Sequence, residues 1–399
     1  MLKALIISPY HAQSHKSWAE GVVLMCPQFE WQILSLPPRH FNWRIRGNPL
    51  ALLFEPSNAT LLNDVDLLVV TSMTDLATLK GLCPTLQNVP TVIYFHENQF
   101  AYPTTKDDAA SRNLEAKLVT LYGALAADVV LFNSHFNRQT YVRGVRQMLS
   151  AFPDHAPQAC VDLIEAKSRV LPVAVLHAGN GLDRNLSATN ARASSATNTH
   201  NPPKPQEKIE KLEQSRVLRI AWNHRWEYDK GPDRLAMVVE KAAEQSVDCE
   251  FSIVGQRFRK IPVSFKALED RFPQLIRHFG YVVDEGEYRD LLSQNDIVLS
   301  TALHDFQGLS VLEATRLGCI PLVPDRLAYA EYIPQEFRYR SYLHDANSEA
   351  SEVVRWLQRY VMQFRQNTLP MPPDLERFSM VSLAPKYSAV FNALLANGT

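Results

Sequence analysis

The segment DIVLSTALHDFQGLSVLEATRLGCIPLVP (residues 296–324) decides the fold. Two short apolar runs, at 296–301 and 319–324, enclose a stretch with helical spacing at 308–317. This order predicts two parallel strands joined by a helix, the repeating unit of α/β proteins. A polar loop follows the first strand, at the edge of an open sheet where such folds bind ligands.

The same alternation extends in both directions along the chain and predicts two doubly wound, Rossmann-like α/β domains that face each other across a cleft. In the second domain, strands are expected at 218–224, 249–255 and 276–281, with helices at 232–245 and 284–293. In the first domain, strands are expected at 2–8, 31–36, 66–71, 91–97, 127–134 and 169–175, with helices at 14–25, 107–125 and 135–149.

Composition marks the domain boundaries. Residues 184–206 are rich in Ser, Thr, Asn, Ala and Pro, which cannot bury enough apolar surface to offset the entropy of ordering, so we expect a linker or mobile insertion. Two helical stretches, 348–366 and 374–397, end the chain. The expected units are residues 1–177, a linker at 178–215, a second domain at 216–373, and a final helix at 374–399.

Charge and cysteine content exclude several classes of protein. With 41 Lys and Arg against 42 Asp and Glu, the 399-residue chain is too weakly basic to coat nucleic acid along its length, although a local basic face is compatible with this balance. Its five cysteines are scattered without a CxxC pair, so neither a disulfide framework nor a zinc site is expected. The start resembles a strand rather than a signal peptide, and no apolar run approaches the ~18 residues that a membrane span requires. We therefore expect a cytoplasmic protein that does not enter a membrane.

Several nucleotide-binding motifs are absent. The sequence has no GxGxxG and no GxxxxGK[ST], and only 14 of its residues are glycine, which disfavours a dinucleotide-dependent oxidoreductase or a P-loop enzyme. Asp64-Val65-Asp66 spells a DxD, which holds a metal in some sugar-nucleotide enzymes. It precedes its strand, at the wrong edge of the sheet, so we interpret it as a pair of carboxylates at the start of a strand and expect no metal site.

Charged residues follow two strands of the second domain. Arg225 and Lys230 flank the turn into the helix at 232–245, and Asp305 and Glu313 lie in the loop and helix after 296–301. Two cations beside helix N-termini, including the one near Gly308, would suit a diphosphate. Solvated loop cations, a helix-capping aspartate and a solvated glutamate are the alternatives that spacing alone leaves open.

These residues resemble the donor site of GT-B glycosyltransferases of family 4, which carry an Arg, a Lys and a Glu-x7-Glu pair. The resemblance covers 216–335, and a last helix that crosses back to the first domain fits 374–397. It implies that Arg225 and Lys230 bind the donor diphosphate, that Glu313 binds the ribose and that Asp305, in place of the first Glu, binds sugar hydroxyls. It also implies a retaining mechanism without a metal. The expected donor-binding residues are Asn223, Arg225, Lys230, Gly255, Tyr281, Asp305, Gly308, Leu309, Ser310 and Glu313.

Four runs in the first half are similar to the tRNA-queuosine mannosyltransferase family: SPYHAQSHKSWAEG (8–21), LPPRHFNWRIRGNP (36–49), YFHENQFAYP (94–103) and LFNSHFNR (131–138). The resemblance implies transfer of mannose from GDP-mannose to the cyclopentenediol of queuosine in the anticodon of an aspartate tRNA. A GT-B enzyme with a glycan, lipid or small-molecule acceptor is one alternative. A non-catalytic sugar-nucleotide or RNA-binding protein is another, and the oligomeric state is open.

Polar residues after the strands of the first domain fit an acceptor site, where they could align a hydroxyl for attack. The expected acceptor-binding residues are Ser8, His11, Ser14, His15, His96, Glu97, Asn98, Asn133 and Ser134. Structural histidines and a Ser134 helix cap are the alternatives. We expect the catalytic residues to be Arg225, Lys230, His96 and Asp305.

Two windows of the first domain, 31–54 and 129–153, contain no Asp or Glu. Their cations, with rings interleaved in the first window, suit RNA phosphates and unpaired bases. Core aromatic rings with solvated arginines are the alternative. The expected tRNA-binding residues are Arg39, His40, Trp43, Arg44, Arg46, Arg138, Arg143 and Arg146.

Overall fold

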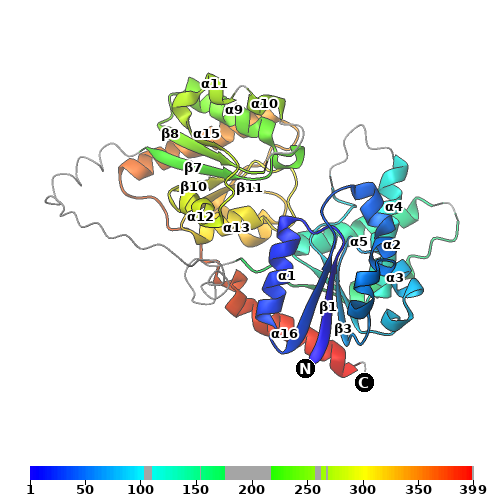
Figure 1. Cartoon of the computed structure of the whole chain (residues 1–399). Coiled ribbons are helices and arrows are strands. Elements are labelled where there is room, and N and C mark those ends of the chain that lie inside the picture. Colours follow the sequence, from blue (N-terminus) through cyan, green and yellow to red (C-terminus); the bar gives the residue numbers. More distant parts are fainter. Residues whose placement is uncertain (103–109, 153, 176–216, 257–261, 267, 398–399) are drawn as a thin grey trace, which may run out of the picture.

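The computed structural model describes residues 1–102, 110–152, 154–175, 217–256, 262–266 and 268–397. Two parallel sheets form the framework of the molecule, and each lies between layers of helices (Figure 1). This confirms the predicted pair of doubly wound α/β domains. The proposed linker at 178–215, including the Ser- and Thr-rich stretch, lies outside the described residues.

The first sheet has the order β2-β1-β3-β4-β5-β6, and its strands pair in parallel. The inner strands β1, β3, β4 and β5 are mostly buried apolar runs, as expected where both faces of a sheet are covered, whereas the edge strands β2 and β6 are only partly buried. Their bounds are β1 Leu2–Ser8, β2 Phe29–Ser35, β3 Leu67–Thr71, β4 Thr91–Phe95, β5 Val129–Phe132 and β6 Ser168–Val170. The helices between them are α1 Gln13–Met25, α2 Phe41–Leu53, α3 Leu76–Leu82, α4 Ala110–Ala126, α5 His135–Ser150 and α6 Ala159–Ala166.

The second sheet has the order β12-β11-β10-β7-β8-β9, again with parallel pairing. Its strands are β7 Leu218–Asn223, β8 Cys249–Val254, β9 Ile276–Gly280, β10 Ile297–Leu299, β11 Ile320–Pro324 and β12 Arg338–Tyr339. Its helices are α9 Pro232–Glu244, α10 Val263–Lys266, α11 Leu268–Arg271, α12 Glu285–Ser293, α13 Leu309–Arg316, α14 Tyr329–Tyr332 and α15 Ala346–Arg365.

The last helix, α16 (Met380–Asn397), packs beside α1 of the first domain, as predicted (Figure 1). The indole nitrogen of Trp18 donates to the Tyr387 hydroxyl at 3.1 Å, and Leu383 and Phe391 join the same core. The helix begins later than the predicted residue 374, because residues 371–373 read Met-Pro-Pro and a separate turn at Glu376–Phe378 follows.

Direct contacts also join the two domains. The amide of Gln307, in the second domain, bonds to both the backbone N–H and the carbonyl of Val173 in the first, at 3.0 and 2.9 Å. Glu331 accepts from the backbone N–H groups of His135 and Phe136 at the start of α5, at 3.0 and 3.2 Å. These bonds hold the carboxyl edges of the two sheets toward each other.

Candidate active site

The loop between β7 and α9 carries the predicted cations. A short turn, Tyr228–Lys230, brings the chain to Gly231, whose φ is +67°. A Cβ at that glycine would lie 2.2 Å from the carbonyl oxygen of Thr301, so only glycine allows the loop to approach the end of β10 this closely. The cations are thereby held against the loop that carries Asp305.

Lys230 is the centre of a charged cluster. Its side chain is only 13% exposed, and its Nζ lies 3.2 Å from Asp229 and 3.5 Å from Asp305. It also donates to the carbonyl of His304 at 2.9 Å. Burial lowers the pKa of Lys230, but Asp305 and Asp229 outweigh burial and raise the pKa overall. The amine is therefore held as a cation inside the cleft.

Arg225 extends the cluster toward the first domain. Its guanidinium lies 3.1 Å from Glu227 and 4.0 Å from Asp229, and these carboxylates raise its pKa although burial opposes them. In the first domain, burial raises the pKa of Glu97 while the charge of Arg225 opposes that rise. Tyr102, also from the first domain, stacks edge-on against the His304 ring with centroids 5.4 Å apart. Groups from both domains therefore face one another around the two cations.

Asp305 is an ionised carboxylate that binds several neighbours at once. It accepts from the Gly308 backbone N–H at 2.9 Å and from the Tyr329 hydroxyl at 3.1 Å. Burial alone would raise its pKa, but Lys230 and these hydrogen bonds lower it to about 2. The cap of α13 itself is Gly308, at φ +74°, and a Cβ there would lie 2.5 Å from the Tyr329 ring. Asp305 thus shapes the turn into α13 and pairs with Lys230.

Glu313 is not a solvated helix carboxylate. It is half-buried on α13, and the hydroxyl of Tyr288 donates to its Oε2 at 3.2 Å. Burial raises the pKa of Glu313, and the Tyr288 hydrogen bond opposes this rise. The Asn223 amide donates to that same tyrosine oxygen at 3.1 Å and to the Ser310 carbonyl at 2.8 Å. Two residues that the sequence reasoning missed, Tyr288 and Asp229, therefore position predicted ones.

His224 is a further residue that the prediction omitted. Its two ring nitrogens lie 3.1 Å from the Ser300 hydroxyl and 3.0 Å from the Ser310 hydroxyl. Burial lowers its pKa to about 4, so it is neutral at physiological pH. A Cβ at Gly255 would lie 1.8 Å from the His224 carbonyl, which explains why glycine stands there.

The other predicted donor residues have different surroundings. The side chain of Tyr281 is 56% exposed just after β9. Leu309 is partly buried and packs against the core of each domain, at their junction.

Two of the predicted acceptor histidines, His15 of α1 and His96 after β4, lie together. The rings of His15 and His96 stack with centroids 4.2 Å apart, and Trp18 packs edge-on against His96 at 4.9 Å. Burial lowers the pKa of His15 to about 4 and that of His96 well below its usual value. Ser8 is buried, whereas Ser14 is exposed and His11 half-exposed. Within the described residues, Ser8 Oγ, His15 Nδ1 and His96 Nε2 have no hydrogen-bond partner.

Three other predicted acceptor residues bind the protein itself. Ser134 accepts from the Asn137 N–H at 2.9 Å and so caps helix α5. Helix capping was the alternative to an acceptor role for this residue. Asn133 donates to the His96 carbonyl at 2.8 Å. Asn98 is fully buried, donates to the Asn137 side chain at 2.8 Å and accepts from Phe100 and Ala101 N–H groups. Their side chains shape the loops around His96 rather than present free groups.

Comparison with known proteins identifies the family. A model described as "tRNA-queuosine alpha-mannosyltransferase N-terminal" matches residues 3–175. The tRNA-queuosine alpha-mannosyltransferase of Drosophila melanogaster is 31% identical over 397 residues, which cover 98% of this chain and 97% of the fly protein. The chain belongs to the tRNA-queuosine alpha-mannosyltransferase family.

Several solved structures share the fold of this chain. An alpha,alpha-trehalose-phosphate synthase from Burkholderia vietnamiensis aligns over all of this chain and 98% of its own, with a TM-score of 0.61 and 12% identity. TarM aligns with a TM-score of 0.53 and 15% identity. The alignment covers 88% of this chain and 58% of the TarM chain. These neighbours show a GT-B fold, and the protein is a glycosyltransferase, as its sequence predicted.

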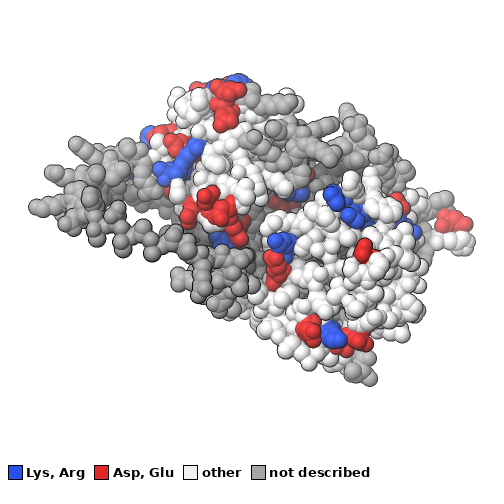
Figure 2. Space-filling view, viewed as in Figure 1, with Lys and Arg blue, Asp and Glu red and all other residues white. Residues whose placement is uncertain are grey.

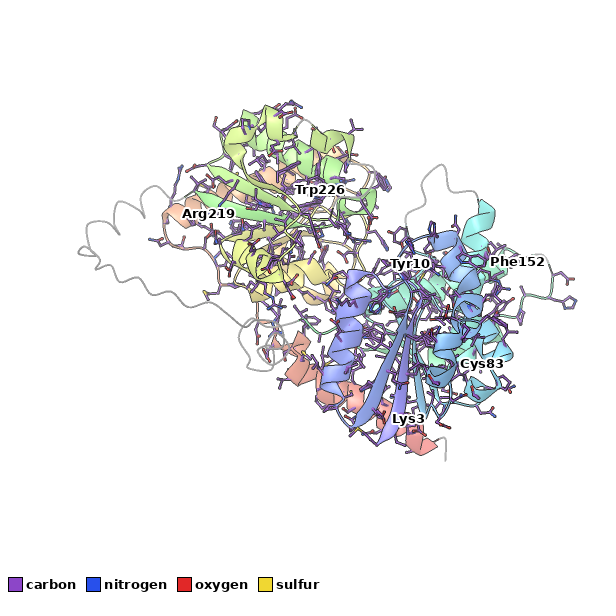
Figure 3. The ribbon with its side chains drawn as sticks, viewed as in Figure 1. Lys3, Tyr10, Cys83, Phe152, Arg219 and Trp226 are labelled. Carbon is purple, nitrogen blue, oxygen red and sulfur yellow. The ribbon has the colours of Figure 1, made fainter. Side chains whose placement is uncertain are left out.

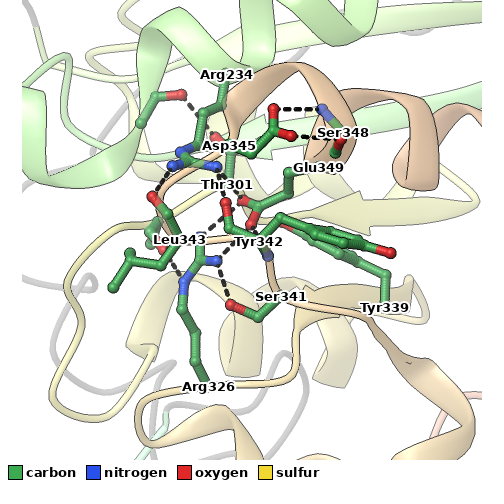
Figure 4. Close-up of polar contacts among 12 residues, drawn as sticks. Arg234, Thr301, Arg326, Tyr339, Ser341, Tyr342, Leu343, Asp345, Ser348 and Glu349 are labelled. Carbon is green, nitrogen blue, oxygen red and sulfur yellow. Dashed lines mark hydrogen bonds and ion pairs between the residues drawn. The ribbon is translucent and has the colours of Figure 1, made fainter.

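A buried ion-pair network supports the second domain (Figure 4). Glu349 is 2% exposed and binds Arg326 at 2.6 and 2.9 Å and Arg234 at 3.0 Å. Arg326 also donates to the carbonyl of Ala302 at 2.8 and 3.0 Å, directly after β10. The network fixes the start of the loop that carries Asp305, and sequence spacing gave no sign of it.

The cations predicted to bind tRNA divide into two groups. Arg46 pairs with Asp75 at 2.5 Å and Glu115 at 3.8 Å, Arg138 with Glu165 at 3.5 Å, and Arg146 with Asp162 at 2.9 Å. For Arg39, Arg44 and Arg143, no ion pair occurs within the described residues. His40 precedes α2 in a left-handed conformation at φ 57°. Figure 2 shows separate basic and acidic patches on the visible face of the first domain rather than one basic surface.

In the parts of the chain that the structure describes, no group of His, Cys, Asp and Glu side chains could hold a metal ion. The DxD lies at the opposite edge of the sheet from the cleft, where Asp66 accepts from the Lys3 N–H at 2.8 Å. Figure 3 shows Lys3 at that far end and Tyr10 at the edge that faces the second domain. No described helix is both long and apolar enough for a membrane crossing.

Proposed function

We propose that this protein transfers mannose, with retention of configuration, from GDP-mannose to the cyclopentenediol of queuosine in tRNA(Asp). Family membership over nearly the whole chain supports the reaction and the tRNA acceptor. The observation that carries the proposal is the meeting of two halves of one site. Tyr102 of the first domain packs against the ring of His304, whose carbonyl binds Lys230. The charges of Arg225 and Lys230 also oppose the burial that raises the pKa of Glu97 in the first domain.

In this proposal the donor diphosphate binds between Arg225, Lys230 and the start of α13. Arg225 exchanges its contact with Glu227 for phosphate oxygens, while Lys230 remains held by Asp305. The two cations neutralise the charge that develops on the leaving group, so that no metal ion is required. Glu313 accepts from the ribose, with its carboxyl oriented by the Tyr288 hydroxyl.

The chemical step is a displacement at the sugar C1. The acceptor hydroxyl oxygen forms a bond to C1 on the face that the diphosphate leaves, and the bond from C1 to the diphosphate oxygen breaks. GDP departs with the electron pair, and its phosphate oxygen takes the acceptor proton. Catalysis then rests on positioning and on charge neutralisation by the two cations.

The acceptor diol would bind among neutral side chains of the first domain. Because their pKa values are lowered, His15 and His96 are uncharged at neutral pH and can exchange hydrogen bonds with hydroxyl groups. Ser8 Oγ and one nitrogen of each ring lack a partner within the described residues.

A tRNA acceptor and five free cysteines support a cytoplasmic setting.

The decisive experiment supplies the purified protein with queuosine-containing tRNA and GDP-mannose, with UDP-glucose as the competing donor. Digestion to nucleosides and mass spectrometry should show a hexose on queuosine, from GDP-mannose only and equally with and without EDTA. Loss of activity in EDTA would contradict the metal-free mechanism. Transfer to no nucleoside, or to a free glycan instead, would overturn the tRNA assignment.

Donor roles can be separated by calorimetry. Asp305→Asn should weaken binding of GDP-mannose much more than binding of GDP, because Asp305 is expected to contact the sugar. An equal loss for both ligands would show that Asp305 serves only to hold Lys230.

A further inference from the structure

Helix α2 carries apolar side chains on its solvent side. Trp43, Leu50 and Phe54, spaced seven and four residues apart at its two ends, are 54, 50 and 71% exposed. At 3.6 residues per turn these three positions fall on one narrow stripe. The opposite side of the helix is the buried one, and it includes Ile45 and Leu52. We call Trp43, Leu50 and Phe54 the α2 stripe.

The ring of Trp43 lies flat against the helix. A Cβ placed at Gly47 would be 2.6, 2.7 and 2.7 Å from the indole atoms Cε2, Cδ2 and Cζ2. Cε2 and Cδ2 are the carbons shared by the two rings, so another atom can approach both this closely only from the ring face. One face of the indole therefore covers Gly47, and the other is turned to solvent.

Charge around the stripe favours an anionic partner. No Asp or Glu occurs between residues 31 and 54, and Arg39 and Arg44 make no ion pair within the described residues. Arg46, by contrast, is bound to Asp75 and anchors the helix. Exposed aromatic rings beside arginines that are available to phosphates are the combination that single-stranded nucleic acids bind. Indole rings are also common at membrane and protein interfaces, so the tRNA acceptor of the family decides in favour of a nucleic acid.

The N-terminal end of α2 lies next to Tyr10. Phe41, the first residue of α2, packs edge-on against Tyr10 with ring centroids 6.0 Å apart. Tyr10 in turn lies in the cleft, where burial and the charge of Glu97 raise its pKa. The helix is held rigidly, since Asn48 donates to the Met73 carbonyl at 3.2 Å and accepts from the Asp75 N–H at 3.3 Å. Trp43 lies two residues after Phe41, so a nucleic acid on the stripe would reach the end of the helix that contacts Tyr10.

We propose that the α2 stripe is a stacking platform for unpaired bases of the RNA acceptor, with Trp43 as the base-stacking residue nearest the cleft. The inference rests on the proposed function and adds the surface that holds the RNA. Gly47 is part of the platform because it is the residue that lets the indole lie flat.

Two substitutions test the platform. Trp43→Ala should weaken binding of an unmodified tRNA(Asp) transcript by roughly 5- to 150-fold, the range expected for one lost base-stacking contact. Gly47→Ala should also weaken it, because the new methyl group displaces the ring. Alanine favours a helix over glycine, so this variant should keep or raise the thermal stability of the protein. If Trp43 has only a structural role, the variants should instead lose thermal stability while tRNA binding stays unchanged.

Leu82→Ala serves as the matched control. Leu82 is 51% exposed at the C-terminal end of α3 in the same domain, outside both acid-free windows, and Figure 3 shows its neighbour Cys83 far from Tyr10. Binding is measured by fluorescence anisotropy with labelled tRNA, and GDP-mannose affinity is measured in parallel by calorimetry. GDP-mannose affinity should be unchanged in all three variants, and tRNA affinity should be unchanged in the control.

The outcomes separate this inference from the proposed function. If the wild-type protein modifies tRNA but Trp43→Ala binds tRNA normally, the platform is wrong and the function stands. If the wild-type protein neither binds nor modifies tRNA, the proposed function itself fails. A change from dimer to monomer in Trp43→Ala by sedimentation, with tRNA binding intact, would make the stripe a contact between two copies and overturn the proposal.

Discussion

Replacing Lys230 with methionine removes one charge and keeps most of the side-chain volume. The ammonium group now contacts Asp229 at 3.2 Å, Asp305 at 3.5 Å and the His304 carbonyl at 2.9 Å. The substitution therefore has two separate consequences. It removes a cation from the proposed diphosphate site, and it leaves two carboxylates without their nearest positive partner.

The structure gives a magnitude for each consequence. Loss of one preorganised group that stabilises developing negative charge costs about 2–4 kcal/mol, so kcat/KM should fall roughly 30- to 900-fold. For stability, burial raises and Lys230 lowers the pKa of Asp305, which drops from 3.8 to about 2. At about 1.4 kcal/mol per unit this net shift corresponds to roughly 2.5 kcal/mol, which Lys230 shares with the bonds from the Gly308 N–H and the Tyr329 hydroxyl. A lowered carboxyl pKa stabilises the fold above pH 3.8 and ceases to do so as pH falls toward 2, so the loss is fully felt at neutral pH.

The double variant Lys230→Met with Asp305→Asn separates the two effects. It removes one of the two stranded charges, so stability in urea should recover in part while kcat/KM stays low. Lys241→Met, which removes the same charge from the far end of α9, is the control and should change neither quantity. Near-normal transfer by Lys230→Met, or recovery of activity in the double variant, would refute the assignment of Lys230 to the diphosphate.

Three further predictions concern other parts of the site. Glu313→Gln should weaken the binding of GDP and of GDP-mannose equally, as measured by calorimetry. Tyr288→Phe should weaken the binding of both by a smaller ~0.5–1.5 kcal/mol, the value of one hydrogen bond. A loss of affinity for GDP-mannose alone would contradict a contact between Glu313 and the ribose. The buried, neutral His224 has a pKa of about 4 against the usual 6.5, so the unfolded chain takes up its proton first and stability should fall from pH 6.5 to pH 4. His224→Gln should flatten that slope in thermal unfolding, and an unchanged slope would refute the linkage. Gln307→Ala leaves the Val173 N–H and carbonyl without their partner and should lower the free energy of unfolding by about 2–4 kcal/mol. Scanning calorimetry should then show the two domains beginning to unfold separately. A single transition at the wild-type temperature would contradict this role of Gln307.

The strands were predictable because buried parallel strands are short, continuous apolar runs, and the predicted 2–8 coincides with β1. Helix α2 was not predicted. Its Pro49 lies inside the helix, and Trp43, Leu50 and Phe54 place apolar side chains on the solvent side, out of phase with the core. A periodicity search looks for the buried stripe, so an exposed one hides the helix.

The clustering of the residues predicted to bind the donor was easier to foresee than the surroundings of the residues predicted to bind the acceptor, for a physical reason. Arg225, Lys230 and Asp305 sit in short loops directly after strands, where topology alone brings them together. Asn98 and Ser134 occupy similar positions, but their short polar side chains can also satisfy nearby backbone groups, and in this protein they do. Residue type and position do not distinguish these two uses.

Charge patterning along the sequence also has a definite limit. A window without Asp or Glu shows only that no carboxylate neighbours its arginines in the sequence. The carboxylate that pairs with Arg46 is Asp75, which lies just before α3, far along the chain. Asp75 is 1% exposed and caps α3, so Arg46→Ala would strand a buried charge and cost stability before it changed tRNA binding. Arg44 has no such carboxylate partner within the described residues. A loss of tRNA affinity in Arg44→Ala therefore reports on the RNA surface itself, whereas the same loss in Arg46→Ala would report first on the fold.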